Sequence, residues 1–438
     1  MKPVLIIGGG ISGIQAALDL ADQGIKVYLV EKSPSIGGRM AQIDKTFPTL
    51  DCASCILTPK MVAAGSHSNI ELLTYSEVKE IKGQAGDFNV KILRKPRYVD
   101  VDKCTGCGEC TVKCPSKVLD EYNLNMSYRK AIYIPFPQAV PRKAVIDAEH
   151  CIRLNPPERL AEKAKERPLC GVCMMICPAK AIDFNQKPET IELNVAAIIV
   201  ATGLTLEDPS KRPEYGYGRY ANVYTHLEFE RLLSSTGPTG GEIVRRSDGK
   251  HPRSIAFIQC VCSRDVQTNK YCSAICCMAS TKQAILAKEH LPDVECTIFY
   301  MDIRSYGKGY QDFVERAKKE FGIKYVRGRP GEIEEDPETK NLIVRYENTM
   351  KGVLEKLEVD MVVLAVGVRP VIPDIGLDLD EDGFVNLVKP YVDPTATSID
   401  GVYVCGVAAG AKDIPDSVTQ AGMAAVKASI LAAGVRNG

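Results

Sequence analysis

The sequence has no excess of charge of either sign and no long apolar run. Its 438 residues include 55 lysines and arginines and 55 aspartates and glutamates, so the formal net charge is zero. This balance excludes the basic footprint of a nucleic-acid-binding protein. No apolar run reaches the roughly 18 residues that a membrane-spanning helix needs. The N-terminus leads directly into a strand and a glycine turn without a signal-peptide layout, so we expect a cytoplasmic protein.

Histidine is scarce and cysteine is abundant. The five histidines are scattered along the chain, and we interpret them as ordinary surface or core residues. The 17 cysteines are clustered instead, with eight between residues 104 and 177 and five between 260 and 277. Because cytosolic thiols stay reduced, such clusters indicate metal or redox chemistry rather than a disulfide framework.

A dinucleotide-binding unit opens the chain. The apolar strand 3–7 ends in Gly8-Gly9-Gly10-Ile11-Ser12-Gly13, which matches G-x-G-x-x-G, and a helical pattern, a second strand and Glu31 follow. Glycine permits the tight turn and lets backbone N–H groups approach a pyrophosphate, while the acid binds the ribose hydroxyls. This ordered set favours a bound dinucleotide over a merely structural glycine turn.

With Gly37-Gly38-Arg39-Met40 the chain resembles the FAD-binding reductases that have two dinucleotide-binding domains, such as glutathione and thioredoxin reductases. Segments 201–203, 365–370 and 401–406 match later landmarks of that superfamily, although Val407 stands where an Asp usually contacts the ribityl chain. The FAD-binding residues that the motif and the resemblance imply are Gly8, Gly10, Ile11, Ser12, Gly13, Glu31, Lys32, Gly38, Arg39, Met40, Val78, Ala201, Thr202, Gly203, Gly406, Pro415 and Ser417.

An internal repeat locates an insertion. The strand pattern of residues 69–93 recurs at 322–344, and in the second copy a closing strand follows soon after. In the first copy the closing strand, 191–194, comes only after about 90 extra residues, which indicates a domain inserted into a meander loop. All eight cysteines of the first cluster lie in this insert.

The insert has the cysteine spacing of a bacterial ferredoxin. The first run, C-x2-C-x2-C-x3-C-P, comprises Cys104, Cys107, Cys110 and Cys114. The second run has 18 residues in place of two after its first cysteine and comprises Cys151, Cys170, Cys173 and Cys177. Because the fourth cysteine of such a run binds the other cluster, the predicted ligand sets exchange Cys114 and Cys177. Zinc is the alternative for thiolate quartets, and the doubled run beside a flavin fold disfavours it.

A second dinucleotide-binding domain begins at strand 253–259 but lacks its glycine motif. Cys260-Val261-Cys262-Ser263-Arg264-Asp265 stands where G-x-G-x-x-G is expected, so the backbone cannot easily approach a pyrophosphate. The five thiols suggest a third [4Fe–4S] cluster, with three ligands from 272–277 and a fourth from Cys260 or Cys262. Packed or free thiols are the alternative. Adjacent side chains diverge on a helix, so we expect irregular backbone at residues 276–277.

This combination resembles the A subunit of heterodisulfide reductase, with the A subunit of the quinone-interacting membrane-bound oxidoreductase as a close relative. The specific stretches are 47–60, 259–265, 271–277 and 412–416. The resemblance implies that the third cluster is held by Cys260, Cys272, Cys276 and Cys277, and it leaves the role of Cys262 open. Longer family members add an N-terminal domain and a C-terminal ferredoxin, so we expect a short form.

Four further residues are candidates for positions near the flavin. Cys52 and Cys55 stand where glutathione-reductase-like enzymes hold a redox disulfide, and they are a redox dithiol, ligands of a nearby cluster or a structural pair. Lys60 and Lys412 are candidates to tune the flavin, with solvated lysines as the alternative. Segment 415–420 predicts a helix start capped by Asp or Ser, whose N-terminus would stabilise negative charge on the flavin.

We therefore predict an α/β fold, a thioredoxin- and glutathione-reductase-like flavoprotein with two dinucleotide-binding domains and an inserted α+β bacterial-type 2[4Fe–4S] ferredoxin. The FAD-binding domain is expected in three parts, 1–98, 188–250 and 369–438. The ferredoxin is expected at 99–187, and a degenerate NAD(P)-like domain with the atypical iron–sulfur site at 251–368.

The resemblance implies an oxidoreductase subunit with one FAD and three [4Fe–4S] clusters that performs electron bifurcation or confurcation. The implied partners are B- and C-like subunits of heterodisulfide reductase, ferredoxin, a second copy of the chain and a hydrogenase- or dehydrogenase-type input subunit. One alternative is a quinone-linked A subunit without bifurcation. Two others are a self-sufficient NAD(P)H oxidoreductase, which the missing glycine motif disfavours, and an iron–sulfur storage module, which the FAD landmarks disfavour.

Overall fold

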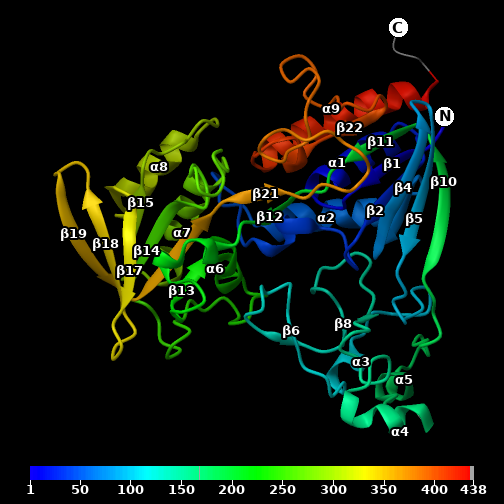
Figure 1. Ribbon diagram of the computed structural model, residues 1–438, viewed down its shortest axis with the longest axis horizontal. Helices are drawn as coiled ribbons and strands as arrows, with labels where there is room; N and C mark the ends of the chain where they lie inside the picture. The colour runs from blue at the N-terminus through cyan, green and yellow to red at the C-terminus, as the bar shows by residue number, and fades with distance from the viewer. Residues whose placement is uncertain (167, 435–438) are drawn as a thin grey trace.

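The computed structural model describes residues 1–166 and 168–434. Two sheet-based domains lie side by side, and the smaller cysteine-rich insert extends from the first of them (Figure 1). Within the described residues, no helix combines the length and the apolar character that crossing a bilayer requires.

The first domain is built on a parallel five-stranded sheet. Its strands, in spatial order, are β22 (Val402–Val404), β11 (Ala197–Val200), β1 (Val4–Ile7), β2 (Val27–Glu31) and β3 (Ile70–Thr74). Parallel sheets are normally covered on both faces, and here one face packs against three helices. These helices are α1 (Ile11–Ala21), α2 (Ala53–Ser66) and α9 (Ile414–Ala432).

An antiparallel meander covers the other face of this sheet. It consists of β4 (Ser76–Gln84), β5 (Asp87–Arg94) and β10 (Glu189–Val195). Arg94, the last residue of β5, pairs with Glu189, the first residue of β10. The chain therefore leaves the meander and returns to it at one pair of facing residues, which explains how a whole domain can be inserted there without disturbing the sheet.

The insert is small and its regular elements are short. Its helices are α3 (Glu109–Val112), α4 (Ala161–Glu166) and α5 (Val172–Ile176). Its strands are β6 (Val118–Leu119), β7 (Tyr128–Arg129), β8 (Ile132–Tyr133) and β9 (Val145–Ile146). Cysteines of both runs pack against its small apolar core, so the thiols are part of the interior of this domain.

The second domain repeats the plan of the first. Its parallel sheet runs β13 (Val223–Thr225), β20 (Met361–Val366), β14 (Ser254–Val261), β15 (Glu295–Tyr300) and β16 (Lys324–Arg327). One face carries the helices α6 (His226–Leu233), α7 (Cys276–His290) and α8 (Tyr310–Lys319). The other face carries the meander β17 (Pro330–Glu335), β18 (Leu342–Asn348) and β19 (Val353–Val359).

The boundary expected at residue 250 is too late. β13 pairs in parallel with β20 of the second sheet, and Phe229 of α6 contacts Phe257 of β14 at a ring-centroid distance of 5.6 Å. The segment from β13 onward therefore belongs to the second domain. The sequence did not reveal this, because a three-residue strand that pairs with residues about 140 positions away leaves no local signal.

The two domains are joined by two chain crossings that pair with each other. β12 (Leu204–Leu206) leads into the second domain and β21 (Val368–Pro370) leads back, and they form an antiparallel ribbon between the sheets (Figure 1).

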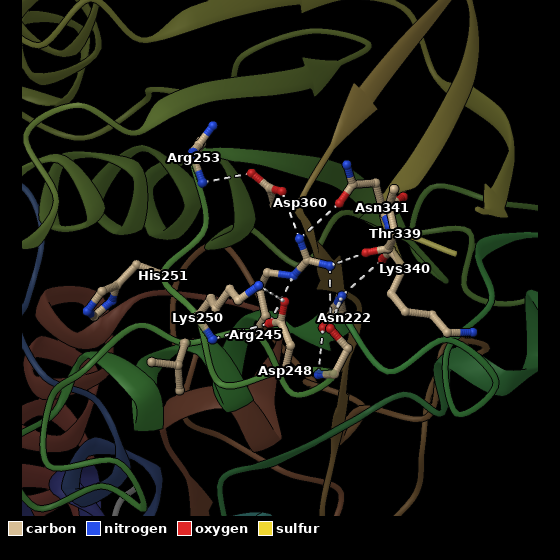
Figure 2. A network of polar contacts seen from close by, with 12 residues as sticks. Asn222, Arg245, Asp248, Lys250, His251, Arg253, Thr339, Lys340, Asn341 and Asp360 are labelled. Atoms are coloured by element: carbon tan, nitrogen blue, oxygen red, sulfur yellow. Dashed lines mark hydrogen bonds and ion pairs between the residues drawn. The ribbon is translucent and has the colours of Figure 1, made fainter. Parts of the chain in front are cut away.

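Arg245 ties the start of the second sheet to its meander (Figure 2). Its buried guanidinium forms an ion pair with Asp360 at 2.9 Å and donates to the Asn341 side chain at 2.9 Å. The other oxygen of Asp360 accepts from the backbone N–H of Arg253 at 2.7 Å. This network thus joins the residues directly before β14 and β20 to the turn between β17 and β18.

Replacing Arg245 by methionine should lower the free energy of unfolding by about 1–3 kcal/mol, because it leaves the mostly buried Asp360 carboxylate without its cation. Arg345 is the control, since its ion pair with Glu334 is half-exposed and such pairs contribute about 0–1 kcal/mol. Chemical denaturation measures both. Equal losses for Arg245→Met and Arg345→Met would contradict the assigned role.

Candidate functional site

The glycine turn after β1 is shaped to accept a pyrophosphate. Gly8 has a φ of +108°, and a Cβ there would lie 2.4 Å from the Ala201 carbonyl oxygen. A Cβ at Gly13 would lie 1.9 Å from the Gly8 oxygen, so this glycine allows α1 to pack closely on the strand. A Cβ at Gly10 would meet no atom within 4 Å. The three glycines thus have the three roles known for this motif: tight turn, open approach and close packing.

Glu31, the last residue of β2, faces the same turn. Its carboxylate accepts hydrogen bonds from the backbone N–H groups of Gly9 at 2.7 Å and Ser33 at 2.8 Å. The acid is therefore held at the turn, where a ribose can reach it. The neighbouring Lys32 is exposed.

The remaining glycine landmarks converge on this turn. A Cβ at Gly38 would lie 2.9 Å from the Cα of Gly10, and one at Gly406 would lie 2.6 Å from the Ser12 hydroxyl oxygen. The Ser417 hydroxyl is 3.9 Å from the same Gly406 position, so the first turn of α9 reaches this point as well. Segments from both ends of the chain therefore form one cradle.

The other predicted FAD-binding residues differ in burial and in their hydrogen-bond partners. Met40 is buried, and Arg39 bonds to the carbonyl of Leu204 at 3.3 Å, while burial lowers the pKa of its guanidinium. Thr202 donates to the Val371 carbonyl. The side chain of Val78 is partly buried and packs against the core between sheet and meander.

Val407 occupies the position at which related reductases usually have an Asp that contacts the ribityl chain. It is buried and packs with Val368 and Phe384. Its side chain serves the contact between the domains, which is why an apolar residue stands there.

Cys52 and Cys55 are bonded to each other at the start of α2. Cys52 is the N-cap residue, and its sulfur accepts from the backbone N–H of Cys55 at 3.2 Å. Both residues are exposed. The pair is thus accessible from solvent. Its geometry does not distinguish between a redox dithiol, ligands of a nearby cluster and a structural pair.

The two candidate lysines have different surroundings. Lys60 on α2 donates to the side chain of Gln15 on α1 at 2.7 Å. Lys412 donates to the carbonyls of Gly406 and Gly410, both at 2.8 Å, and so fixes the loop between β22 and α9. Burial lowers the pKa of Lys412 to about 8.

This shift predicts a pH dependence of stability. Folded Lys412 releases its proton near pH 8, while the unfolded chain holds it to about 10.5, so between these values the unfolded state binds more protons. The free energy of unfolding should therefore rise with pH in this window relative to Lys412→Met. Denaturation of both proteins at several pH values tests this, and parallel curves would contradict it.

The eight cysteines of the insert gather around two cavities. One cavity is lined by Cys104, Cys107, Cys110 and Cys177. The other is lined by Cys114, Cys151, Cys170 and Cys173. The structure therefore brings together the same crossed sets that the spacing predicts. Burial raises the pKa of Cys110 to about 12 and that of Cys173 to about 11, and the neighbouring thiols add to both shifts.

The donor chemistry of these cavities fits iron–sulfur clusters. Across residues 1–166 and 168–434, no three His, Cys, Asp or Glu side chains are grouped tightly enough to hold a single metal ion. A [4Fe–4S] cluster asks for a different arrangement, because each of its four irons takes one thiolate and the ligands surround a cage. Four thiols around an apolar cavity provide this arrangement.

Four of the five thiols between residues 260 and 277 form one group. Burial raises the pKa of Cys276 well above its usual range, and Cys260, Cys277 and Cys272 raise it further as close neighbours. The pKa of Cys277 rises to about 11, again mainly through burial and with Cys260 and Cys272 contributing. The group therefore holds the four residues that the family resemblance implied.

Cys262 points elsewhere. It is fully buried, and its thiol donates to the Asp208 carbonyl at 3.7 Å. Burial raises its pKa to about 11, and Glu207 adds to this rise. Of the two strand-end candidates, the structure thus brings only Cys260 to the group.

The irregular backbone expected at residues 276–277 is wrong. Both residues are helical and are the first two of α7. The irregularity lies just before them, where Ala274 has a φ of +61°, and at Cys260, whose φ is +59°. Left-handed residues around the thiols, rather than a break between Cys276 and Cys277, shape this site.

The atypical thiol group adjoins the flavin cradle. Tyr271 and Ile275, which flank Cys272, pack against the apolar cluster that contains Val407. The Tyr271 ring contacts Phe384 at a centroid distance of 4.9 Å, and its hydroxyl donates to the Val368 carbonyl at 2.7 Å. Sequence reasoning missed this contact, although the aromatic residue directly before Cys272 was a visible signal.

Family models match three parts of the chain. FAD-dependent oxidoreductase matches residues 3–47, 4Fe–4S binding domain matches 97–120, and pyridine nucleotide-disulphide oxidoreductase matches 278–425. Thioredoxin reductase from T. acidophilum is similar in structure, with a TM-score of 0.53 at 16% identity over 99% of both chains. Together these findings define an FAD and iron–sulfur oxidoreductase with the thioredoxin-reductase fold.

Curated relatives identify the family. The chain is 54% identical to the iron–sulfur A subunit of the CoB–CoM heterodisulfide reductase of Methanocaldococcus jannaschii, over 98% of this chain and 64% of that protein. It is 51% identical to the A subunit of the H2:CoB–CoM heterodisulfide, ferredoxin reductase of Methanothermobacter thermautotrophicus, over 97% of this chain and 63% of that protein. The chain belongs to the family of heterodisulfide reductase A subunits and spans somewhat less than two thirds of the length of these relatives.

Proposed function

We propose that the chain is the flavin and iron–sulfur electron-transfer subunit of a heterodisulfide-reductase-like complex. It would bind one FAD in the glycine cradle and three [4Fe–4S] clusters, two in the insert and one at the atypical group. The observation that carries this proposal is the grouping of twelve cysteines into three sets of four, one of which adjoins the flavin cradle.

The glycine cradle and the thiol sets have complementary tasks in this proposal. Bound flavin supplies the exchange between two-electron and one-electron transfer. The chain holds the dinucleotide through the glycine turn and Glu31, and the helix α9 directs its positive N-terminal end toward the same place. The contact of Tyr271 and Ile275 with the Val407 cluster keeps the atypical site against this cradle.

The second domain supports an electron-transfer role better than NAD(P)H binding. Cys260 lies at the end of β14 and Cys262 directly follows the strand, and both have a positive φ where a nucleotide turn would need glycine. The thiol group therefore takes the place at the end of the sheet where a nucleotide would bind. This disfavours a self-sufficient NAD(P)H oxidoreductase.

A reduction experiment separates these functions. Mixed anaerobically with NADH or NADPH, the purified holoprotein should keep its oxidised flavin absorbance, while a low-potential one-electron donor such as reduced ferredoxin should bleach it. Rapid bleaching by NADPH alone would overturn the proposal in favour of the self-sufficient enzyme. The native mass in cell extract should also lie far above the 47.8 kDa of the chain.

The partners and the energy-coupling step are extensions of this proposal. We infer B- and C-like subunits, a ferredoxin or a hydrogenase- or dehydrogenase-type input subunit, a second copy of the chain and a cytoplasmic location. The names of the relatives pair a heterodisulfide with ferredoxin, which supports flavin-based bifurcation or confurcation here. A quinone-linked role without bifurcation predicts instead that a soluble quinone analogue reoxidises the reduced protein.

A further inference from the structure

Tyr310 connects the second domain to the first turn of the flavin helix. It lies at the start of α8 in the second domain and is 4% exposed. Its hydroxyl donates to the carboxylate of Asp413, which is also buried. The other oxygen of Asp413 accepts from the backbone N–H of Asp416 at 3.0 Å, so Asp413 is the N-cap of α9. One hydrogen bond therefore links the two domains at the end of α9 that faces the cradle.

The ring of Tyr310 packs against two other aromatic rings. It contacts Phe47 of the first domain edge-to-face at a centroid distance of 5.7 Å, and Tyr306 at 6.0 Å. Burial raises the pKa of Tyr310, and the bond to Asp413 raises it further, so the hydroxyl stays protonated as a donor. The hydrogen bond is thus fixed by packing and does not depend on a mobile surface side chain.

Tyr306, in the loop before α8, is 57% exposed and packs against the Tyr310 ring. Asp413 and Asp416 add to the rise that burial causes in the pKa of Tyr306, so this loop lies beside the first turn of α9.

We propose that Tyr310 is a positioning residue for the flavin site: its hydroxyl partly neutralises the Asp413 carboxylate at the N-terminus of α9 and fixes the second domain against it. This inference rests on the proposed flavin site. A carboxylate near the flavin opposes the arrival of an electron, and a donor on that carboxylate weakens the effect. Tyr310 would in this way raise the reduction potential of the flavin.

Redox titration of the holoprotein tests this proposal. Tyr310→Phe keeps the ring and removes only the hydroxyl, so the flavin midpoint potential should shift to a more negative value. Asp413→Asn keeps a good helix cap and removes the charge, so it should shift the potential to a more positive value. In the Asp413→Asn background, the added Tyr310→Phe change should have little effect, because the two residues act as a pair.

Tyr346 provides the matched control. It is a buried tyrosine of the same domain whose hydroxyl donates to Glu355 at 2.7 Å, within the meander. Tyr346→Phe should leave the flavin potential unchanged. An unshifted Tyr310→Phe protein, or a shift that persists in the Asp413→Asn background, would overturn the inference. If Tyr310→Phe fails to retain FAD, the flavin midpoint potential of Asp413→Asn tests the inference instead. An unshifted potential in that variant would overturn the inference.

The FAD content of the wild-type protein is measured first. If the purified wild-type protein contained no FAD, the proposed function would be overturned, and this inference with it. A wild-type protein with FAD and an unshifted Tyr310→Phe variant would overturn the inference alone.

Discussion

Replacing Cys272 by serine should remove about four of about twelve irons per chain, the content of one cubane. Cys272 belongs to the thiol group that contains Cys260, Cys276 and Cys277, and serine keeps its size while removing the thiolate ligand. The characteristic absorption and the paramagnetic signal of one cluster should disappear together with this iron. Anaerobic iron and sulfide analysis, with EPR of the reduced protein, measures the loss.

Cys262→Ser is the matched control for this prediction. Cys262 lies in the same segment, two residues from Cys260, but its thiol donates to Asp208 and is not part of the group. This variant should keep all of its iron. An equal loss from Cys262→Ser would mean that iron content follows the folding of the segment and not ligation. Full iron in Cys272→Ser would contradict the ligand set itself.

Replacing Gly10 by alanine should abolish or strongly weaken FAD binding while the apoprotein remains folded. A Cβ at Gly10 meets no protein atom within 4 Å, so the fold has room for it. The methyl group would instead occupy the space through which the backbone approaches the pyrophosphate. We expect at least a tenfold weaker affinity for FAD, or about 1.4 kcal/mol of lost binding energy. Flavin content after desalting and titration of the apoprotein with FAD test this.

Gly331 provides the control for Gly10. It also has open surroundings and no positive φ, but it lies in β17 of the second domain, far along the chain from the cradle. Gly331→Ala should bind FAD as the wild type does, and the two apoproteins should melt at similar temperatures. If Gly10→Ala binds FAD normally, the glycine cradle is not the dinucleotide site.

Local patterns predicted much of this molecule. The glycine turn, Glu31 and the order of elements around them indicate a dinucleotide-binding fold from the sequence alone, because each residue type answers a local backbone requirement. The cysteine spacing predicts the two crossed sets of the insert, since three cysteines of each run hold one cluster and the fourth binds the other cluster. The four cysteines implied for the third site also lie together.

Contacts between distant segments could not be predicted in this way. The pairing of β13 with β20 and the bond from Tyr310 to Asp413 join residues more than 100 positions apart, and neither leaves a periodic signal. The helical state of Cys276 and Cys277 was also missed. There the left-handed residues before the helix, Cys260 and Ala274, provide the irregularity that we expected within the helix itself.

The central claim is that one chain holds one FAD and three [4Fe–4S] clusters, so that flavin and clusters form a single electron-transfer unit. The most direct test is the content of iron, acid-labile sulfide and FAD per chain in protein purified without oxygen. We predict about 12 iron and 12 sulfide for each FAD. A content of about 8 iron for each FAD would mean that only the insert is loaded, and it would contradict the third cluster at Cys260, Cys272, Cys276 and Cys277.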